Sequence, residues 1–189
     1  MWKINRHSSM NNIDDKRPFL KVNIAILTVS DTRTIETDKS GDLLSKRINE
    51  AGHSVIDRLI VKDDKNKIRD ILLKWVKDKM VDVVISTGGT GITGKDLTPE
   101  VFNEILEKEI PGFGELFRWL SYKKIGTSSL QSRASAGVCK GTYLFSLPGS
   151  TGACKDAWDQ ILIHQLDNRF RPCNLVELMP RLREHEEDQ

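Results

Sequence analysis

Residues 81–91 of the chain read VDVVISTGGTG, and this stretch decides the fold. Its first seven residues are rich in β-branched side chains, which favour an extended strand. The strand runs directly into three glycines within four residues. A buried strand that ends in a glycine turn before a helical pattern is typical of α/β proteins with a parallel sheet.

The same alternation of strand and helix patterns continues on both sides of this stretch. Short apolar runs predict further strands over residues 23–30, 55–61 and 142–147. Apolar residues at helical spacing predict helices over about 40–51, 64–76, 98–106, 113–120 and 153–162. We therefore expect an α/β fold, a single-domain, doubly wound, mostly parallel sheet flanked by helices.

Polar residues mark where several of these helices begin. Ser40 and Thr98 are the expected N-caps of two helices, and Pro99 suits the first helical position after Thr98. Either Asp63 or Asp64 is expected to cap the helix that follows the second strand.

Several aromatic residues lie on the apolar faces of these helices. Trp75, Trp119 and Trp158 are expected in the core or in a subunit contact rather than in a stacking platform. Phe113 and Phe117, in the helix that carries Trp119, fit either a core or a subunit contact.

The two ends of the chain differ from this periodic centre. Residues 1–20 are polar and charged without a steady period, so we expect a flexible extension. Residues 21–175 form the predicted domain, and residues 176–189, which end in EHEEDQ, are expected to be a solvated tail.

Composition and charge exclude several classes of function. The net charge is only +2, with basic residues spread along the chain, which argues against a nucleic-acid partner. No apolar run is long enough to cross a membrane or to act as a signal peptide, so a cytoplasmic protein is expected. The cysteines Cys139, Cys154 and Cys173 form no C-x-x-C pair and are expected to be reduced thiols.

The glycine loop Thr87, Gly88, Gly89, Thr90 and Gly91 is the first candidate ligand site. Ligands of open parallel sheets bind beyond the carboxyl ends of the strands, where this loop is expected to lie. Glycines let the backbone approach a ligand closely and point successive N–H groups at an anion. For the motif alone, a simple tight turn is an equally good interpretation, and the loop matches neither the dinucleotide nor the P-loop fingerprint.

Two acidic positions are expected at the same edge of the sheet. Asp96 precedes the helix start at Thr98, and Asp63 follows the second strand. Both carboxylates could bind a divalent cation that also contacts phosphates. Each could instead be an ordinary acid at a helix start, where the helix dipole favours it by roughly 0.3–1 kcal/mol.

Other polar turns fall at strand ends or helix starts. Ser30 and Asp31 end the first strand, Ser40 opens the first helix, and Pro148, Gly149 and Ser150 end the last strand. Strand ends of this kind offer N–H groups to a second anion, although a plain helix start is the alternative.

One arginine is a further candidate. Arg133, beside Ser132, would bind phosphate with two parallel hydrogen bonds, although most arginines simply lie on the surface.

Six motifs taken together are more specific than any one of them. They are TVSDTR at 28–33, DKSG at 38–41, TGGTGITGKDLTPE at 87–100, IPGFGE at 110–115, LQSR at 130–133 and LPGS at 147–150. In this order and spacing the chain resembles the MoaB and MogA proteins of molybdenum cofactor biosynthesis over about residues 20–175. Segments 125–138, 148–158 and 166–174 are more similar to MoaB than to MogA.

The resemblance implies a function and roles for particular residues. It implies that the protein binds molybdopterin and adenylylates it with ATP and Mg²⁺. The loop from Thr87 to Gly91 would bind a phosphate, and Asp96 would be the catalytic and metal-binding acid. Asp63 matches a second acid, although Lys62 replaces the proline that usually precedes it. Residues 148–150 match the family's other ligand loop.

The resemblance also implies partners for the chain. Proteins of the family form trimers, and MoaB types pair trimers into hexamers. Other molybdenum cofactor biosynthesis proteins are further possible partners.

Two other functions stay open from the sequence. The protein could bind molybdopterin or the finished cofactor as a carrier without transforming it. A dinucleotide-dependent oxidoreductase would fit the sheet but lacks the expected glycine fingerprint.

Overall fold

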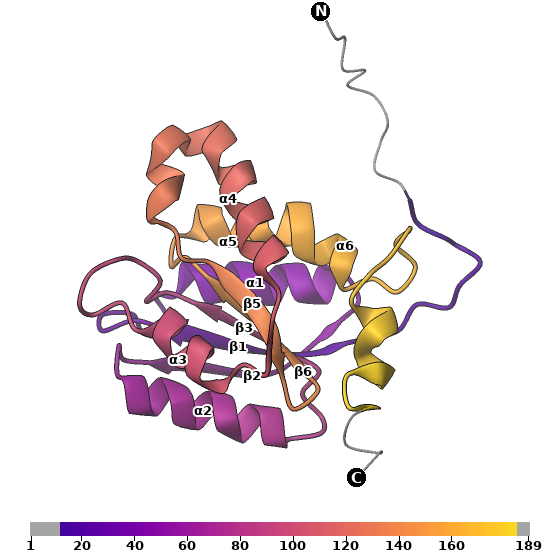
Figure 1. The fold of residues 1–189 in the computed structure, drawn as a ribbon, viewed down its shortest axis with the longest axis horizontal. Coiled ribbons are helices and arrows are strands. Elements are labelled where there is room, and N and C mark those ends of the chain that lie inside the picture. Colours follow the sequence, from indigo (N-terminus) through magenta and orange to yellow (C-terminus); the bar gives the residue numbers. More distant parts are fainter. Residues whose placement is uncertain (1–11, 185–189) are drawn as a thin grey trace, which may run out of the picture.

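In the computed structural model, which describes residues 12–184, six strands pair in the order β2-β1-β3-β6-β5-β4 (Figure 1). The strands are β1 (Asn23–Val29), β2 (Ser54–Val61), β3 (Val83–Thr87), β4 (Lys108–Glu109), β5 (Ser135–Cys139) and β6 (Thr142–Leu147). The α-helices are α1 (Lys39–Glu50), α2 (Lys65–Lys77), α3 (Thr98–Ile105), α4 (Pro111–Ile125), α5 (Thr151–Ala157) and α6 (Ile163–Gln165). Short helical segments are η1 (Gly126–Gln131), η2 (Trp158–Leu162) and η3 (Val176–Arg181).

Strand direction divides the sheet into two parts. β2, β1, β3 and β6 are parallel, whereas at one edge β5 pairs antiparallel with β6, and β4 pairs antiparallel with β5. This arrangement confirms the doubly wound, mostly parallel α/β fold. The sequence did not predict β4 and β5, because β4 has two residues and β5 contains small residues without a clear strand pattern.

Alternate residues of the central strands pack against different helices. Ile24 and Ile26 of β1 belong to the core under α1, α4 and α5, whereas Ala25 and Leu27 face the core under α2 and α3. Figure 1 shows these two helical layers on opposite faces of the sheet. Both faces of β1 are therefore apolar, which explains its unbroken hydrophobic sequence.

The helix starts differ in part from the predictions. Asp38, not Ser40, caps α1, because its carboxylate accepts a hydrogen bond from the amide of Gly41. Asp64 caps α2, as one of the two predicted alternatives. Thr98 is the first residue of α3 rather than its N-cap.

The segments on either side of the predicted domain contact it in the structure. The amide of Leu20 donates to the Asn168 side chain at 2.8 Å, and Asn168 donates to the carbonyl of Pro18 at 2.9 Å. Val176 is buried at the start of η3. Residues 12–20 of the predicted extension and 176–184 of the predicted tail therefore pack on or beside the domain. Residues 1–11 and 185–189 lie outside the described part of the chain.

The aromatic residues of the helices have different environments. Trp75, Trp158, Phe113 and Phe117 are buried within the chain, so of the two predicted alternatives, the core and a subunit contact, the core holds for them. Trp119 is 58% exposed on α4, which rules out a core role for it.

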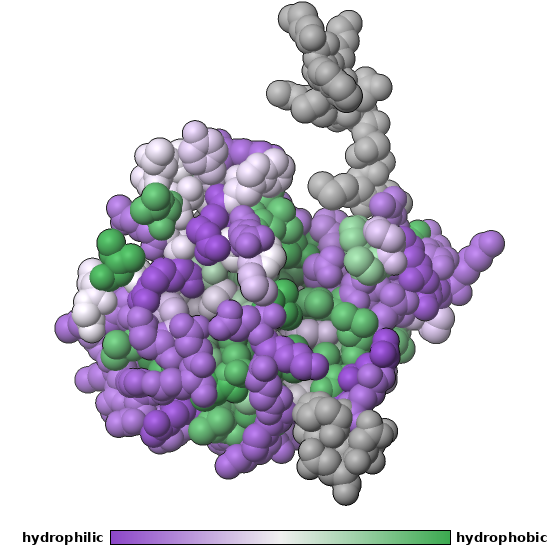
Figure 2. Space-filling model, in the orientation of Figure 1, coloured by the Kyte–Doolittle hydropathy of each residue, from purple (hydrophilic) through white to green (hydrophobic). Residues whose placement is uncertain are grey.

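The surface is mixed in character. Hydrophobic residues are interspersed with hydrophilic ones on the face shown in Figure 2. Within residues 12–184, no helix combines the length and the hydrophobicity needed to span a membrane.

His53 couples the stability of the fold to pH. The residue is 4% exposed, and its Nδ1 accepts a hydrogen bond from the amide of Val22 at 3.1 Å. Burial lowers the pKa of His53 from 6.5 to about 4, against the attraction of Asp167 and with some help from Lys21. Since the unfolded chain binds this proton more readily, stability falls as the pH drops from 6.5 towards 4.

We expect the free energy of unfolding to fall by about 2 kcal/mol between pH 7 and pH 5 through His53, at about 1.4 kcal/mol per pH unit. Urea unfolding at the two pH values measures this loss. His53→Asn keeps an acceptor near the position of Nδ1 but does not titrate. The free energy of unfolding of this variant should therefore fall by about 2 kcal/mol less over the same pH range. An identical pH dependence in both proteins would show that His53 is not responsible.

Candidate functional site

A cavity of about 550 Å³ lies at the carboxyl ends of the parallel strands. Its position follows from the topology, because β2, β1, β3 and β6 all end at this edge. The sequence-predicted residues that line it are Ser30, Asp63, Thr87, Gly88, Gly89, Thr90, Gly91, Asp96, Ser132, Pro148, Gly149 and Ser150. The fold therefore brings most of the predicted site together, from four strand ends.

The glycine loop requires glycine for steric reasons. Gly88 has φ +102°, and a Cβ atom there would lie 2.1 Å from the carbonyl oxygen of Val29. Gly89 has φ +62°, and its Cβ would lie 2.8 Å from a carboxylate oxygen of Asp63. The loop thus passes against the end of β1 and against Asp63 with no room for a side chain.

Hydrogen bonds fix the loop from both sides. The amide of Gly88 donates to the carbonyl of Leu147 at 3.0 Å, which ties the loop to β6. The hydroxyl of Thr98 donates to the carbonyl of Gly88, and the amide of Thr98 donates to the carbonyl of Gly89, both at 3.0 Å. Within residues 12–184 the amides of Gly89 and Thr90 have no protein acceptor. Unpaired N–H groups in a loop of this kind can donate to an anion.

Two carboxylates stand beside this loop. Burial, together with the negative charges of Asp31 and Asp96, raises the pKa of Asp63. Burial alone would raise the pKa of Asp96 too, but hydrogen bonds from the hydroxyl and amide of Thr93, at 2.6 and 2.8 Å, hold that pKa below its usual value. Asp96 is therefore a fixed anion, and Asp63 lies in an environment that favours an added positive charge.

Protein groups alone do not complete a metal site here. Among the side chains of residues 12–184, no three histidine, cysteine, aspartate or glutamate residues converge as metal ligands. A divalent cation at Asp63 and Asp96 would need further oxygen ligands from a bound molecule or from water, as Mg²⁺ commonly takes them.

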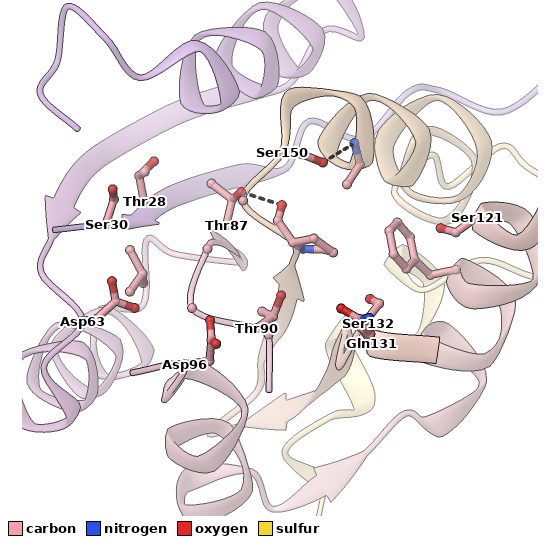
Figure 3. Close-up of a pocket in the computed structure, with 18 of the residues that line it drawn as sticks. Thr28, Ser30, Asp63, Thr87, Thr90, Asp96, Ser121, Gln131, Ser132 and Ser150 are labelled. Carbon is pink, nitrogen blue, oxygen red and sulfur yellow. Dashed lines mark hydrogen bonds between the residues drawn. The ribbon is translucent and has the colours of Figure 1, made fainter. Parts of the chain in front are cut away.

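The opposite side of the cavity has a different chemistry. Phe117, Ser121 and Ile125 of α4 line it, together with Gln131 of η1 and Ser132. Figure 3 shows Ser121, Gln131 and Ser132 across the glycine loop from Asp63. The cavity therefore has one end for charged groups and one end with an apolar surface and neutral hydrogen-bonding groups.

Three predicted site residues lie elsewhere. Ser40 is fully buried, and its hydroxyl donates to the carbonyl of Gly149 at 2.9 Å. Asp31 pairs with Lys95 outside the cavity, at 3.3 Å. Arg133 donates from Nε to the carbonyl of Gly91 at 2.7 Å and from Nη2 to that of Asp96 at 2.8 Å, and does not line the cavity. These side chains brace the loops around the site.

The structure also adds residues that the sequence did not single out. These are Thr28, Val29, Arg33, Phe117, Ser121, Ile125, Ser128, Gln131 and Ala153. Arg33 lies within the TVSDTR motif at 28–33, so this motif could have indicated Arg33 as a site residue. The residues of α4 resembled ordinary helix-face positions, and nothing in their spacing distinguished them from the core.

Comparison with known proteins agrees with this geometry. Residues 25–168 match the family model described as "Probable molybdopterin binding domain". Molybdenum cofactor biosynthesis protein B of Escherichia coli (strain K12) is 50% identical over 156 residues, covering 82% of this chain and 92% of that protein. The protein of the same name from Bacillus subtilis (strain 168) is 47% identical over 151 residues, or 79% and 89% of the two chains.

Solved structures share the fold. A crystal structure of molybdenum cofactor biosynthesis protein B has a TM-score of 0.80 and 43% identity, covering 89% of this chain and 99% of that one. A MogA structure has a TM-score of 0.68 and 32% identity, covering 76% and 97%. The chain therefore belongs to the MoaB and MogA family of molybdenum cofactor biosynthesis proteins.

Proposed function

We propose that this protein binds molybdopterin and adenylylates it with ATP and Mg²⁺. The observation that carries the proposal is the placement of Asp63 and Asp96 beside a glycine loop within one cavity. A volume of about 550 Å³ lies within the usual range of small-molecule sites. The names of its relatives, molybdenum cofactor biosynthesis protein B and MogA, support the choice of ligand.

The two ends of the cavity match the two parts of a phosphorylated pterin. Free amides at Gly89 and Thr90 would bind the phosphate. The pterin ring has flat apolar faces and polar edges, which suit the exposed side chain of Ile125 together with Gln131 and Ser132. The phosphate is thereby directed towards the acidic end of the site.

The acidic pair would hold the divalent cation. Thr93 holds Asp96 as an anion, whereas burial and the neighbouring acids raise the pKa of Asp63. When bound, Mg²⁺ neutralises the negative charges of phosphates that must approach each other. A cation shared with those phosphates also explains why two protein carboxylates suffice.

The reaction needs positioning rather than a covalent nucleophile. A terminal phosphate oxygen of molybdopterin forms a bond to the α-phosphorus of ATP, and the bond from that phosphorus to the β-phosphate oxygen breaks. Pyrophosphate leaves, and adenylylated molybdopterin remains. The loop amides would orient the attacking phosphate, which is the main contribution of a protein to such a transfer.

Replacement of Asp96 by asparagine tests the catalytic proposal. Asp96→Asn keeps the size of the side chain but removes its charge, so turnover with molybdopterin, ATP and Mg²⁺ should fall at least about 100-fold. Release of pyrophosphate and formation of the adenylylated pterin measure the effect.

Asp64→Asn is the matched control. Asp64 is next to Asp63 in the sequence but caps α2, a role that asparagine performs equally well. Its turnover should stay near that of the unaltered protein. Undiminished turnover in Asp96→Asn would remove Asp96 from the mechanism. Pterin binding by the unaltered protein without any ATP turnover would instead support a carrier function.

The glycine loop provides a second test. In Gly88→Ala the new methyl group would meet the carbonyl of Val29, so the loop must move. We expect molybdopterin to bind about 5- to 150-fold more weakly, since backbone strain of this kind costs roughly 1–3 kcal/mol. Calorimetry with the pterin measures the affinity.

Gly94→Ala is the control in the same connection between β3 and α3. A Cβ at Gly94 meets no atom within 4 Å, so affinity should change by less than about 2-fold. Equal affinities of both variants would show that the shape of the glycine loop is not needed for binding.

A further inference from the structure

Among the residues that the structure describes, Arg33 is the one lysine or arginine that lines the cavity. Its side chain is 29% exposed, so it is open to a ligand while being held by the protein. The cavity is lined by two carboxylates and by one positively charged side chain, that of Arg33. Arg33 is therefore the side chain that can offer a ligand phosphate a charge-assisted hydrogen bond.

Hydrogen bonds hold the Arg33 guanidinium at the ligand loop that follows β6. Nη2 donates to the carbonyl of Gly149 at 2.9 Å, and Nη1 donates to the hydroxyl of Ser40 at 3.0 Å. A Cβ at Gly149 would lie 3.3 Å from Cα of Gly88, so this loop touches the glycine loop. The guanidinium is therefore bound to a loop that contacts the glycine loop.

A buried carboxylate supports Arg33 from behind. Asp38 is fully buried and accepts from Thr28 at 2.7 Å and from Arg58 at 2.8 Å, with Arg33 Nη1 farther away at 3.3 Å. Arg58 is thus the closer partner of Asp38. Within residues 12–184, Nε of Arg33 has no acceptor, which leaves this donor for a ligand.

Arg133, the arginine that the sequence favours, is used differently. Its Nε and Nη2 bind the carbonyls of Gly91 and Asp96, and its Nη1 pairs with Glu100. All three nitrogens are engaged outside the cavity. Arg133 is therefore a positioning residue for the connection that carries Asp96.

We propose that Arg33 is the cationic residue that binds the phosphate of the pterin ligand. The proposal rests on the proposed function, because it requires a phosphorylated pterin in this cavity. Arg33 and the free amides of the glycine loop would bind different oxygens of the same phosphate, with the guanidinium supplying the charge-assisted hydrogen bonds.

Binding of molybdopterin and of its dephosphorylated form tests the proposal by calorimetry. The unaltered protein should prefer the phosphorylated pterin. Arg33→Gln should weaken binding of the phosphorylated form about 10- to 100-fold, as expected for loss of a charged hydrogen bond, and leave the dephosphorylated form within about 2-fold. The preference for the phosphate should thus largely disappear.

Arg47→Gln is the matched control, because Arg47 also pairs with carboxylates, those of Glu50 and Asp159, but lies outside the cavity and away from Asp38. It should keep the preference for the phosphorylated pterin. The proposal is wrong if Arg33→Gln retains the full preference, or if it weakens both pterins equally. Failure of the unaltered protein to bind either pterin would reject the proposed function itself.

A measurement on the unaltered protein avoids any dependence on the folding of a variant. Arginine-specific dicarbonyl reagents modify exposed guanidinium groups, and mass spectrometry locates the modified residue. The phosphorylated pterin should slow modification of Arg33, and the dephosphorylated pterin should not. Equal protection by both pterins, or protection by neither at saturation, would overturn the assignment.

Discussion

The close contact between Gly88 and the carbonyl of Val29 is the constraint on which the site depends. It joins the loop after β3 to the end of β1, and it exists because glycine has no Cβ and accepts φ +102°. The hydrogen bond from Gly88 to Leu147 joins the same residue to β6. Three parallel strand ends therefore meet at one backbone position, which leaves the following amides at the edge of the cavity. Any outward shift of this position would separate the glycine loop from the loop after β6.

Around this contact, protein hydrogen bonds hold the carboxylates in place. Asp38 lies beneath the site with Thr28 and Arg58 as partners, and burial, which would raise its pKa, is outweighed by these hydrogen bonds and the Arg58 charge, so that the pKa is lowered. Thr93 does the same for Asp96 at the other side. Such networks hold charges in place before a ligand arrives, which reduces the rearrangement that binding requires.

Asp63 is the exception, because burial and then its acidic neighbours raise its pKa, and no arginine or lysine makes an ion pair with it among residues 12–184. The two carboxylates of the site therefore differ: hydrogen bonds stabilise the charge of Asp96, whereas the surroundings of Asp63 disfavour its charge. Arg33 and Arg133 also differ in what their side chains bind. Arg33 faces the cavity with a free donor, whereas Arg133 uses its nitrogens to hold backbone carbonyls.

The sequence by itself determined the alternation of strands and helices, the glycine loop and the acids Asp63 and Asp96 beside it, because these features depend on local periodicity and on the ends of parallel strands. Only the tertiary structure decided which polar side chains face the cavity. Ser40 and Arg133 turn to backbone carbonyls that are distant in the sequence, and α4 brings Phe117 to the site. Hydrogen-bond partners and packing neighbours of this kind are set by contacts between remote segments, which no local pattern records.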